Sequence, residues 1–455
     1  MSGIAPAAPN DVELGGVWPS PDQEHVDGLA VSLLDHPDVI VARAQAVARF
    51  EACPEFEVAD APATMAAAVD NLLFSCLQFA ANDDPTHPRV GWTVRLPYTL
   101  GERVIPDSHY GADSPDRVYR FIGVSPEHRY EIRGRRHPTH PSVDDLSFES
   151  IPAPGLYGQP LVRLERDRID IGKDGSFTVV ADGSERDGER NHLYLPPETK
   201  SIVVRDTLLD WAHQVPNQVE VRLIDGPELP ERTRDDLAGA GVAIFGECVE
   251  MTLGLLRNCL RGLPANELMA FQRPVHWGMA GNLFALQRFE LGAGEVLLLT
   301  LDPLSAEYLG IAACDPWATS IAYDSHTSSL NQVQAQPNED GTYTFVLSPE
   351  DPGVFNWLDT GGLRTGSVVA RWEGLAESPT EDETGGGETR SPEWAPGTKL
   401  VPQAVRDAHV VRLDEVKEAI PAGQTRVATE ERKRLLAARF AAHWVRMTGR
   451  VVLTD

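Results

Sequence analysis

One short segment of the sequence brings three acid–base side chains within four positions. Asp107, His109 and Tyr110 follow Pro106, and they supply a carboxylate, an imidazole and a phenol. Because an imidazole titrates near neutral pH, His109 can act as a general base, with Asp107 as the carboxylate that orients it. Tyr110 is then a candidate substrate-binding residue. The competing interpretation is a turn that carries a solvated histidine.

A second polar segment, residues 323–331, contains His326 directly after Ser325. Adjacent residues on a strand point to opposite faces, so this adjacency does not by itself predict a nucleophile and its base. His326 alone is a catalytic candidate. The alternative is a turn held by side-chain hydrogen bonds.

The third cluster is the segment 354–362 with the strand-like run that follows it. It supplies Asp359 as a catalytic candidate, and Trp357, Asn356 and Arg371 as substrate-binding candidates. A guanidinium facing a carboxylate can clamp a polar ligand, and an indole can stack on it. A structural role is the alternative, since Asn can satisfy backbone groups at a strand end and Arg can pair with a buried acid.

An earlier part of the chain repeats the pattern of this third cluster. Asp174-Gly175 precedes Asn191 by 17 residues, as Asp340-Gly341 precedes Asn356 by 16. In both copies the first of two paired valines comes 12 residues after the Asn. A repeat that relates Asn191 to Asn356 is too long for a solenoid period and indicates two homologous β domains.

The repeat divides the candidates into two groups. Residues with a counterpart in the other copy are expected to serve the fold, although Arg205 of the first copy stays a binding candidate, in a polar group with Asn191, His192 and Asp206. Trp357, Asp359 and His326 have no counterpart. They are therefore the stronger functional candidates.

Several chemistries lack their sequence motifs. The chain has no Gly-x-Gly-x-x-Gly after a strand, no P-loop, no Gly-x-Ser-x-Gly elbow, no His-Glu-x-x-His and no kinase signature. His137 and His140 are three positions apart, but Pro138 and Pro141 place them on an extended loop without a third ligand. We therefore expect neither a cofactor nor a metal.

The composition limits the partners. A formal net charge of -28 argues against nucleic acid, whose phosphates need a basic surface, and against an anionic membrane. The cysteines are odd in number and form no Cys-x-x-Cys pair, which predicts free buried thiols in a reducing cytoplasm: Cys53, Cys76, Cys248, Cys259 and Cys314. The first 22 residues lack a signal-peptide pattern, and no 18-residue apolar run is present.

The pattern of apolar and turn-forming residues predicts a mainly β fold with α additions, made of two duplicated antiparallel β-sandwich modules of jelly-roll type. Short alternating runs broken by Gly, Pro, Asp and Ser begin at Val90. We expect a flexible arm at 1–24, a helical segment at 25–89, the first sandwich at 90–228, a helical connector at 229–282, the second sandwich at 283–374, an acidic Gly-rich loop at 375–398, and a C-terminal segment at 399–455.

Individual elements follow from periodicity. A helix is expected to begin near Pro37, and two helical stretches are expected to meet at Cys248. Residues 321–323 read as a strand. The final helix, residues 429–448, should pack on the sheets with one apolar face, namely Leu436, Phe440, Trp444 and Met447.

Several of these segments together resemble actinobacterial members of the domain-of-unknown-function family 1214. The resemblance rests on the runs 84–89 and 130–134, the pairs around Asn191 and Arg205, and the run Asp-Pro-Gly-Val-Phe-Asn-Trp-Leu-Asp at 351–359. It covers roughly residues 60 to 450 and implies a β-sandwich module with helical additions. It brings no established activity or cofactor, and the acidic Gly-rich segment at 377–392 departs from it as an insertion.

Three functions are consistent with the sequence. The first is a metal-independent hydrolase or lyase that uses Asp and His acid–base chemistry on a polar small molecule, with carbohydrate-like compounds among the candidates, in a cleft formed by the β modules. The second is a non-catalytic small-molecule-binding protein that uses the same pocket. The third is an assembly module, in which case the protein is a homo-oligomer.

Overall fold

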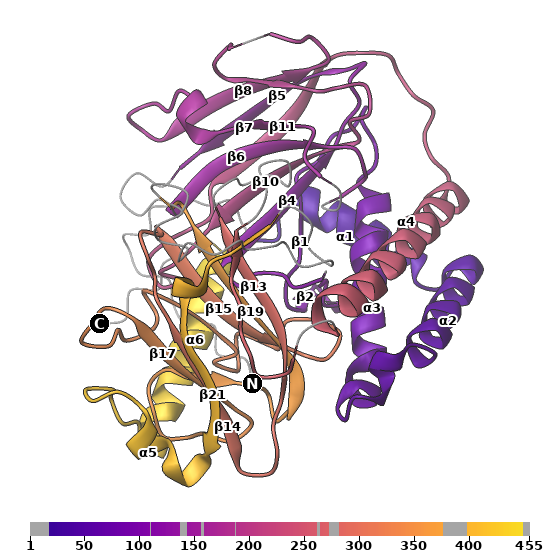
Figure 1. The fold of residues 1–455 in the computed structure, drawn as a ribbon. Coiled ribbons are helices and arrows are strands. Elements are labelled where there is room, and N and C mark those ends of the chain that lie inside the picture. Colours follow the sequence, from indigo (N-terminus) through magenta and orange to yellow (C-terminus); the bar gives the residue numbers. More distant parts are fainter. Residues whose placement is uncertain are drawn as a thin grey trace.

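The computed structural model describes residues 18–109, 111–136, 143–155, 159–186, 188–261, 264–272, 282–375 and 398–448. Two β-sandwiches lie one above the other in Figure 1, and the helices α1 to α4 stand together on one side of them. The prediction of a mainly β fold with two sandwich modules and flanking helices is confirmed.

The first sandwich pairs a five-stranded sheet with a four-stranded one. The larger sheet has the order β1-β4-β10-β6-β7, with the bounds Gly91–Thr93, Arg117–Gly123, Ser201–Thr207, Val143–Ile151 and Val162–Leu164. The smaller sheet has the order β11-β5-β8-β9, with the bounds Gln218–Asp225, Arg129–Arg135, Ser176–Asp182 and His192–Tyr194. The alternation of β8 places Phe177, Val179 and Ala181 in the core between the two sheets.

The second sandwich pairs a six-stranded sheet with a four-stranded one. The larger sheet has the order β16-β15-β19-β13-β12-β20, with the bounds Ser329–Asn331, Tyr308–Cys314, Thr365–Glu373, Leu283–Glu290, Phe271–Gln272 and Lys399–Leu400. The smaller sheet has the order β18-β17-β14-β21, with the bounds Trp357–Asp359, Tyr343–Ser348, Glu295–Leu301 and Val405–Arg412. Every residue of β19 is buried, because this strand is covered on both of its faces.

The two sandwiches share one strand plan. In the larger sheet β10 lies between β4 and β6, as β19 lies between β13 and β15. In the smaller sheets, β8 pairs with β9 in parallel, and β17 pairs with β18 in parallel, while the other neighbours are antiparallel. The turns agree as well: Asp174 accepts from the backbone N–H of Ser176 at 3.2 Å, as Asp340 accepts from that of Thr342 at 3.0 Å. The internal duplication is therefore visible in topology and in turn chemistry.

The helical layer consists of α1 (Pro21–Leu33), α2 (Pro37–Glu51), the 3₁₀ turn η1 (Pro54–Glu57), α3 (Ala61–Ala81) and α4 (Arg234–Leu255). It shares one hydrophobic core with both sandwiches, because Phe121 and Val203 of the first and Leu286 and Val369 of the second belong to that core. The helices thus cover the outer faces of both larger sheets and tie the two modules together. By length and composition α3 and α4 could each span a membrane, but here they pack against each other.

Close contact between α3 and α4 depends on a glycine. A Cβ atom at Gly241 would lie 2.7 Å from Cδ2 of Leu77, so the Leu77 side chain would have to shift to make room for a larger residue. Helix α4 starts with a capping box formed by Thr233 and Asp236. It continues without a break past Cys248 and ends in a π-helical turn, Leu256–Leu260, so the two stretches expected there are one helix.

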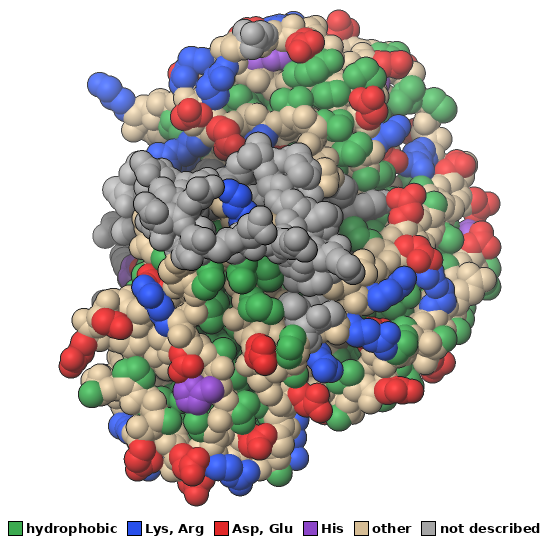
Figure 2. Space-filling view, viewed as in Figure 1, with side chains coloured by type: hydrophobic (Ala, Val, Ile, Leu, Met, Phe, Trp, Pro, Cys, Tyr) green, Lys and Arg blue, Asp and Glu red, His purple; other side chains and the backbone are tan. Residues whose placement is uncertain are grey.

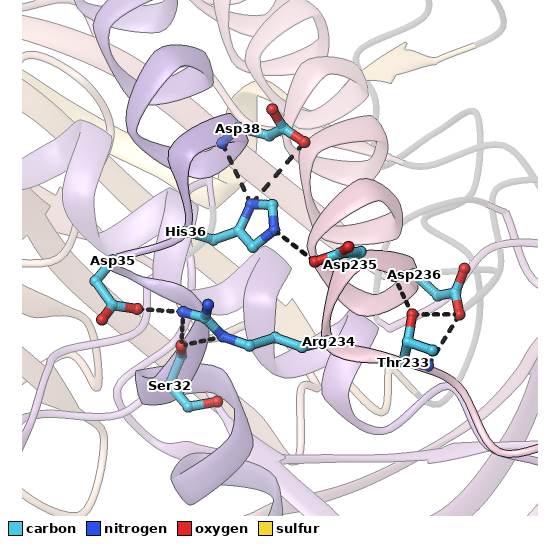
Figure 3. Close-up of polar contacts among 8 residues, drawn as sticks. All are labelled: Ser32, Asp35, His36, Asp38, Thr233, Arg234, Asp235 and Asp236. Atoms are coloured by element: carbon cyan, nitrogen blue, oxygen red, sulfur yellow. Dashed lines mark hydrogen bonds and ion pairs between the residues drawn. The ribbon is translucent and has the colours of Figure 1, made fainter.

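The turn between α1 and α2 is fastened to the start of α4 (Figure 3). Nδ1 of His36 accepts the backbone N–H of Asp38 at 3.2 Å, and Nε2 lies 3.2 Å from Oδ1 of Asp235. Because Nδ1 is an acceptor, the neutral ring carries its proton on Nε2 and donates it to Asp235. Arg234 donates to the carbonyl of Ser32 in the same turn. This joint fixes where the long connector enters the helical layer.

Some expected boundaries differ from the structure. Helix α1 begins at Pro21, inside the expected arm, because Ser20 caps it by accepting the N–H of Gln23. Residues 321 and 322 are irregular and Tyr323 begins a turn, so no strand forms there. The second sandwich also extends beyond residue 374, since β20 and β21 complete its two sheets. These late strands have short or mixed apolar patterns, which hid them from sequence analysis.

The last helix, α6 (Thr429–Thr448), packs with a face that periodicity did not predict. Phe440 and Trp444 are 47% and 44% exposed, whereas Arg446 is 1% exposed and donates to the carbonyl of Arg117. Of the four residues expected to pack, Met447 is buried. The buried arginines of α6 find carbonyl and aromatic partners on the sandwiches, so polar contacts orient this helix. Short elements complete the fold: β2 (Tyr98–Leu100), β3 (Arg103–Ile105) and α5 (Val416–Ala419).

Candidate functional site

Two of the residues singled out in the sequence meet in a loop at the end of the second sandwich. Nδ1 of His326 lies 2.8 Å from Oδ2 of Asp359, although 33 positions separate them. Asp359 ends β18, and its other carboxylate oxygen accepts the backbone N–H of Gly361 at 2.8 Å. The Asp359 side chain is 8% exposed and that of His326 is 39% exposed. A held carboxylate therefore supports an imidazole that reaches solvent.

This contact determines what His326 can do. With its Nδ1–H donated to Asp359, the neutral ring presents the lone pair of Nε2. The hydrogen bond to Asp359 raises the pKa of His326 above its ordinary value of 6.5. The ring can then accept a proton at neutral pH and return it, which is the requirement for a general base and acid.

The loop that carries His326 is anchored on three parts of the molecule. Nε of Arg439 on α6 donates to the carbonyl of Tyr323, and Nη2 donates to Oγ of Ser329 at 2.7 Å. The ring of Tyr323 meets Trp211 of the first sandwich edge to face, with centroids 6.0 Å apart. The imidazole is thus placed by both modules and by the last helix, which limits its motion.

Other His–Asp pairs in the chain have a different character. His192 of β9 lies 3.1 Å from Asp182 of β8, at the parallel strand pair that corresponds to β17 and β18, but its side chain is only 3% exposed. His213 pairs with Asp210 three positions away, both in one surface turn. Among these, His326 combines an exposed ring with a distant, buried carboxylate.

The predicted pair of His109 and Asp107 is wrong. His109 is 3% exposed, and its Nδ1 lies 3.3 Å from Asp113, which was not a candidate. Burial disfavours the charged ring, but the Asp113 carboxylate outweighs this and raises the pKa of His109. The ring is enclosed by protein, which argues against contact with a substrate. Tyr110 lies outside the described residues.

The binding candidates of the third cluster are structural. Asn356 is fully buried, accepts the N–H of Gln336 at 2.8 Å and donates to the carbonyls of Gln336 and Thr344. Trp357 is 7% exposed, donates to the carbonyl of Ser348 and lies under the guanidinium of Arg432 at 5.0 Å. Its ring is therefore not a stacking surface for a ligand.

The two arginine candidates are also occupied. Arg371 is 9% exposed and donates to the carbonyl of Ala112, so it joins the two modules. Arg205 forms an ion pair with Glu149 on the neighbouring strand β6. Both guanidinium groups therefore hold parts of the protein together, and these contacts lend no support to the predicted binding role.

Polar side chains fill the described contact between the two sandwiches, where the sequence suggested a cleft. Asp116 accepts from Trp211 Nε1 at 2.9 Å, from the hydroxyl of Tyr308 at 2.8 Å and from Nδ2 of Asn331 at 2.9 Å. Burial raises the pKa of Asp116. The sequence could not predict this role of Asp116, because its hydrogen-bond donors come from distant positions in the chain.

Cysteine and metal chemistry receive no support from the described residues. Cys76, Cys248 and Cys314 are buried free thiols, and Cys53 is half-buried. No group of three or more His, Cys, Asp or Glu side chains gathers there in a way that could hold an ion. His137 and His140 lie outside the described part of the chain.

The described geometry defines a protein of two fused β-sandwiches with a helical flank and a His–Asp pair in a surface loop. An uncharacterized protein from Burkholderia cenocepacia has a similar structure, with 22% sequence identity and a TM-score of 0.61 over 85% of this chain and 99% of that chain. The VPA0106 protein from Vibrio parahaemolyticus is 8% identical, with a TM-score of 0.38 over 76% and 98%. No family model and no curated protein matches the chain. The first likeness shows the fold alone.

Proposed function

We propose that this protein is a metal-independent enzyme of the hydrolase or lyase type, in which His326 transfers protons and Asp359 holds it in place. The observation that carries the proposal is the contact of 2.8 Å between Nδ1 of His326 and Oδ2 of Asp359, with the imidazole open to solvent. His326 would activate a water molecule or remove a proton from the substrate through Nε2.

The charges around the imidazole favour a neutral or cationic substrate. Asp324 and Asp359 both raise the pKa of His326, and Asp324 lies two positions before it. An anionic substrate would be repelled by these carboxylates, whereas a hydroxyl group of a carbohydrate-like compound could donate a hydrogen bond to Asp324, which is only partly buried.

A turnover assay over a panel of neutral chromogenic compounds tests the proposal. We would assay p-nitrophenyl glycosides and p-nitrophenyl esters with the wild-type protein, with His326→Gln and with Asp359→Asn. Loss of a general base costs roughly 10² to 10⁴ in rate, so kcat should fall by about that factor in His326→Gln while the melting temperature is kept.

His409→Gln is the matched control. Nδ1 of His409 also lies 2.8 Å from an aspartate, Asp407, and its side chain is 45% exposed, but both residues lie on the outer strand β21. Its activity should equal that of the wild type. The proposal fails if His326→Gln retains full turnover, or if no compound of the panel is converted. Thermal stabilisation by a compound that is never converted would instead support a binding protein.

A further inference from the structure

A pair of adjoining cavities lies on the side of the second sandwich where the helical layer meets it. The smaller cavity has a volume of about 130 Å³ and lies between η1, the end of α4, β13 and the start of β19. The larger has a volume of about 420 Å³ and lies between the end of α2, η1 and the end of α4. Both are lined by Pro54, Glu55 and Arg261, so the two cavities are neighbours.

Four arginines line these cavities in a chain whose net charge is -28. Arg49 comes from α2, Arg257 and Arg261 from the end of α4, and Arg288 from β13. Figure 2 shows Lys and Arg side chains gathered on the face where the ends of the helices approach the second sandwich. A concentration of guanidinium groups on an acidic protein marks a place where an anion is attracted locally.

Arg49 forms an ion pair with Glu250, whereas the carboxylate contacts of the other three arginines are long or absent within the described chain. Arg261 contacts Glu55 through Nε at 3.5 Å, and Arg288 reaches Glu290 only at 3.9 Å. Nε of Arg288 is buried without a hydrogen-bond partner, and so is Oε1 of Glu55. For Arg257 no carboxylate lies within ion-pair distance among the residues that the structure describes. A buried, unpaired N–H favours a ligand that can accept from it.

Apart from its two arginines, Glu55, Glu290 and Thr365, the smaller cavity is lined by apolar residues. Val58, Leu260, Phe289 and Pro316 line it together with the arginines. A dry cavity of about 150 Å³ is large enough for a benzene ring, so this one has room for a small ring or a short branched chain. The cavity therefore combines an apolar body with a charged edge, which suits an amphipathic anion.

The walls of the cavity are fixed before any ligand arrives. Oδ2 of Asp60, at the start of α3, accepts from the backbone N–H of Arg364 and of Thr365 at 2.8 Å each, and from the Thr365 hydroxyl at 2.9 Å. Thr365 lines the cavity. Nε1 of Trp317 donates to the carbonyl of Ala61 at 3.0 Å nearby. Such pre-organisation reduces the entropy that binding removes.

We propose that these cavities bind a small organic monocarboxylate, whose apolar part lies against Leu260 and Phe289 and whose carboxylate is held by Arg288 and Arg261. A planar carboxylate matches the two-pronged guanidinium, and its single charge tolerates the neighbouring Glu55 better than a doubly charged phosphate would. Glu55 competes for Arg261 and thereby weakens binding. This site is separate from the His326–Asp359 pair, so it stands or falls independently of the proposed enzyme activity.

Isothermal titration calorimetry with sodium benzoate at low ionic strength tests the assignment. The wild-type protein should bind benzoate with a Kd below about 1 mM, as expected for a ligand of this size. Benzamide, which has the same shape without the charge, should bind at least about tenfold more weakly. Arg288→Gln should raise the Kd for benzoate about tenfold or more, and Glu55→Gln should lower it.

Two controls separate the site from general charge effects. Arg406→Gln removes an exposed arginine of β21 that pairs with Asp302, and it should leave the Kd unchanged. His326→Gln should also leave it unchanged. No benzoate binding at 10 mM, or equal binding by the wild type and Arg288→Gln at equal melting temperature, would overturn the proposal. Tighter binding of phenyl phosphate than of benzoate would overturn the assignment to a monocarboxylate.

Discussion

Nδ1 of His326 and Oδ2 of Asp359 lie 2.8 Å apart, and this contact joins a loop to the end of a strand that the first sandwich also possesses. At the corresponding end of β9 the first sandwich has Tyr194, which cannot act as this carboxylate does. The second sandwich therefore carries an acidic group at a position where the first sandwich forms the same strand pair without one.

Asp359→Asn should lower the pKa of His326. The hydrogen bond and the charge of Asp359 favour the protonated ring, and an amide keeps the shape without the charge. NMR titration of the imidazole measures the change directly. An unaltered pKa would show that Asp359 does not act on the ring.

The His326–Asp359 pair should stabilise the folded protein at acidic pH. A raised pKa in the folded state means that the interaction stabilises fully below pH 6.5 and is lost as the pH rises through the higher folded value. Chemical denaturation should therefore find the largest difference between wild type and His326→Gln near pH 5. A difference that grows with pH would contradict this assignment.

Asp315→Asn should stabilise the protein at pH 8. Burial raises the pKa of Asp315 to about 7, so above that pH a charged carboxylate is held in the interior. The amide oxygen can still accept the N–H groups of Trp317 and Thr319, which Oδ1 now accepts at 2.9 Å each. The gain in melting temperature should shrink as the pH falls from 7 to below 3.8, where the carboxyl is neutral in both states.

His443→Gln should protect the protein from mild acid. Burial, with Arg446 and Arg439 nearby, lowers the pKa of His443 to about 3. The folded protein therefore does not bind the proton that the unfolded chain binds below pH 6.5. Because of this group, the free energy of unfolding of the wild type falls by up to about 1.4 kcal/mol for each unit of pH below 6.5. Urea unfolding at pH 7 and pH 5 should show a smaller loss for the variant. Equal losses would sink the prediction.

Asn356→Ala should destabilise the protein more than Asn191→Ala. The two side chains have equivalent roles in the two modules. The amide oxygen of Asn191 accepts the backbone N–H of Asp170 at 2.6 Å, and that of Asn356 accepts the backbone N–H of Gln336 at 2.8 Å. Asn356 is fully buried, so its removal leaves backbone groups without water, at a cost of roughly 1 to 3 kcal/mol each. Asn191 is half-buried, and water can replace it. Equal losses in urea denaturation would show that burial does not decide the difference.

The sequence predicted the two-module fold because turn residues and spacing survive duplication. It also separated Asn356, which the repeat assigned to the fold, from His326 and Asp359, which the repeat left unexplained. The contact between those two residues depends on how a loop returns to β18 and has no local signature.

Other interpretations from sequence failed for physical reasons. Trp357 has no counterpart in the first copy, yet it is not free for a ligand. The second module packs against α6, and Arg432 of that helix lies over the Trp357 ring. The periodicity of α6 could not show that Arg446 would find a carbonyl and two aromatic rings inside the protein. Phe440 and Trp444 were then left at the surface.

The late position of β21 has a consequence for synthesis on the ribosome. All strands of the first sandwich have been synthesised once Asp225 is translated, whereas the inner strand β14 lacks its outer neighbour until residues 405–412 follow. A nascent chain thus carries an open sheet edge for more than a hundred codons, and such edges invite wrong pairing. A truncated product that ends before Val405 should aggregate, while one that ends after β21 should remain in solution.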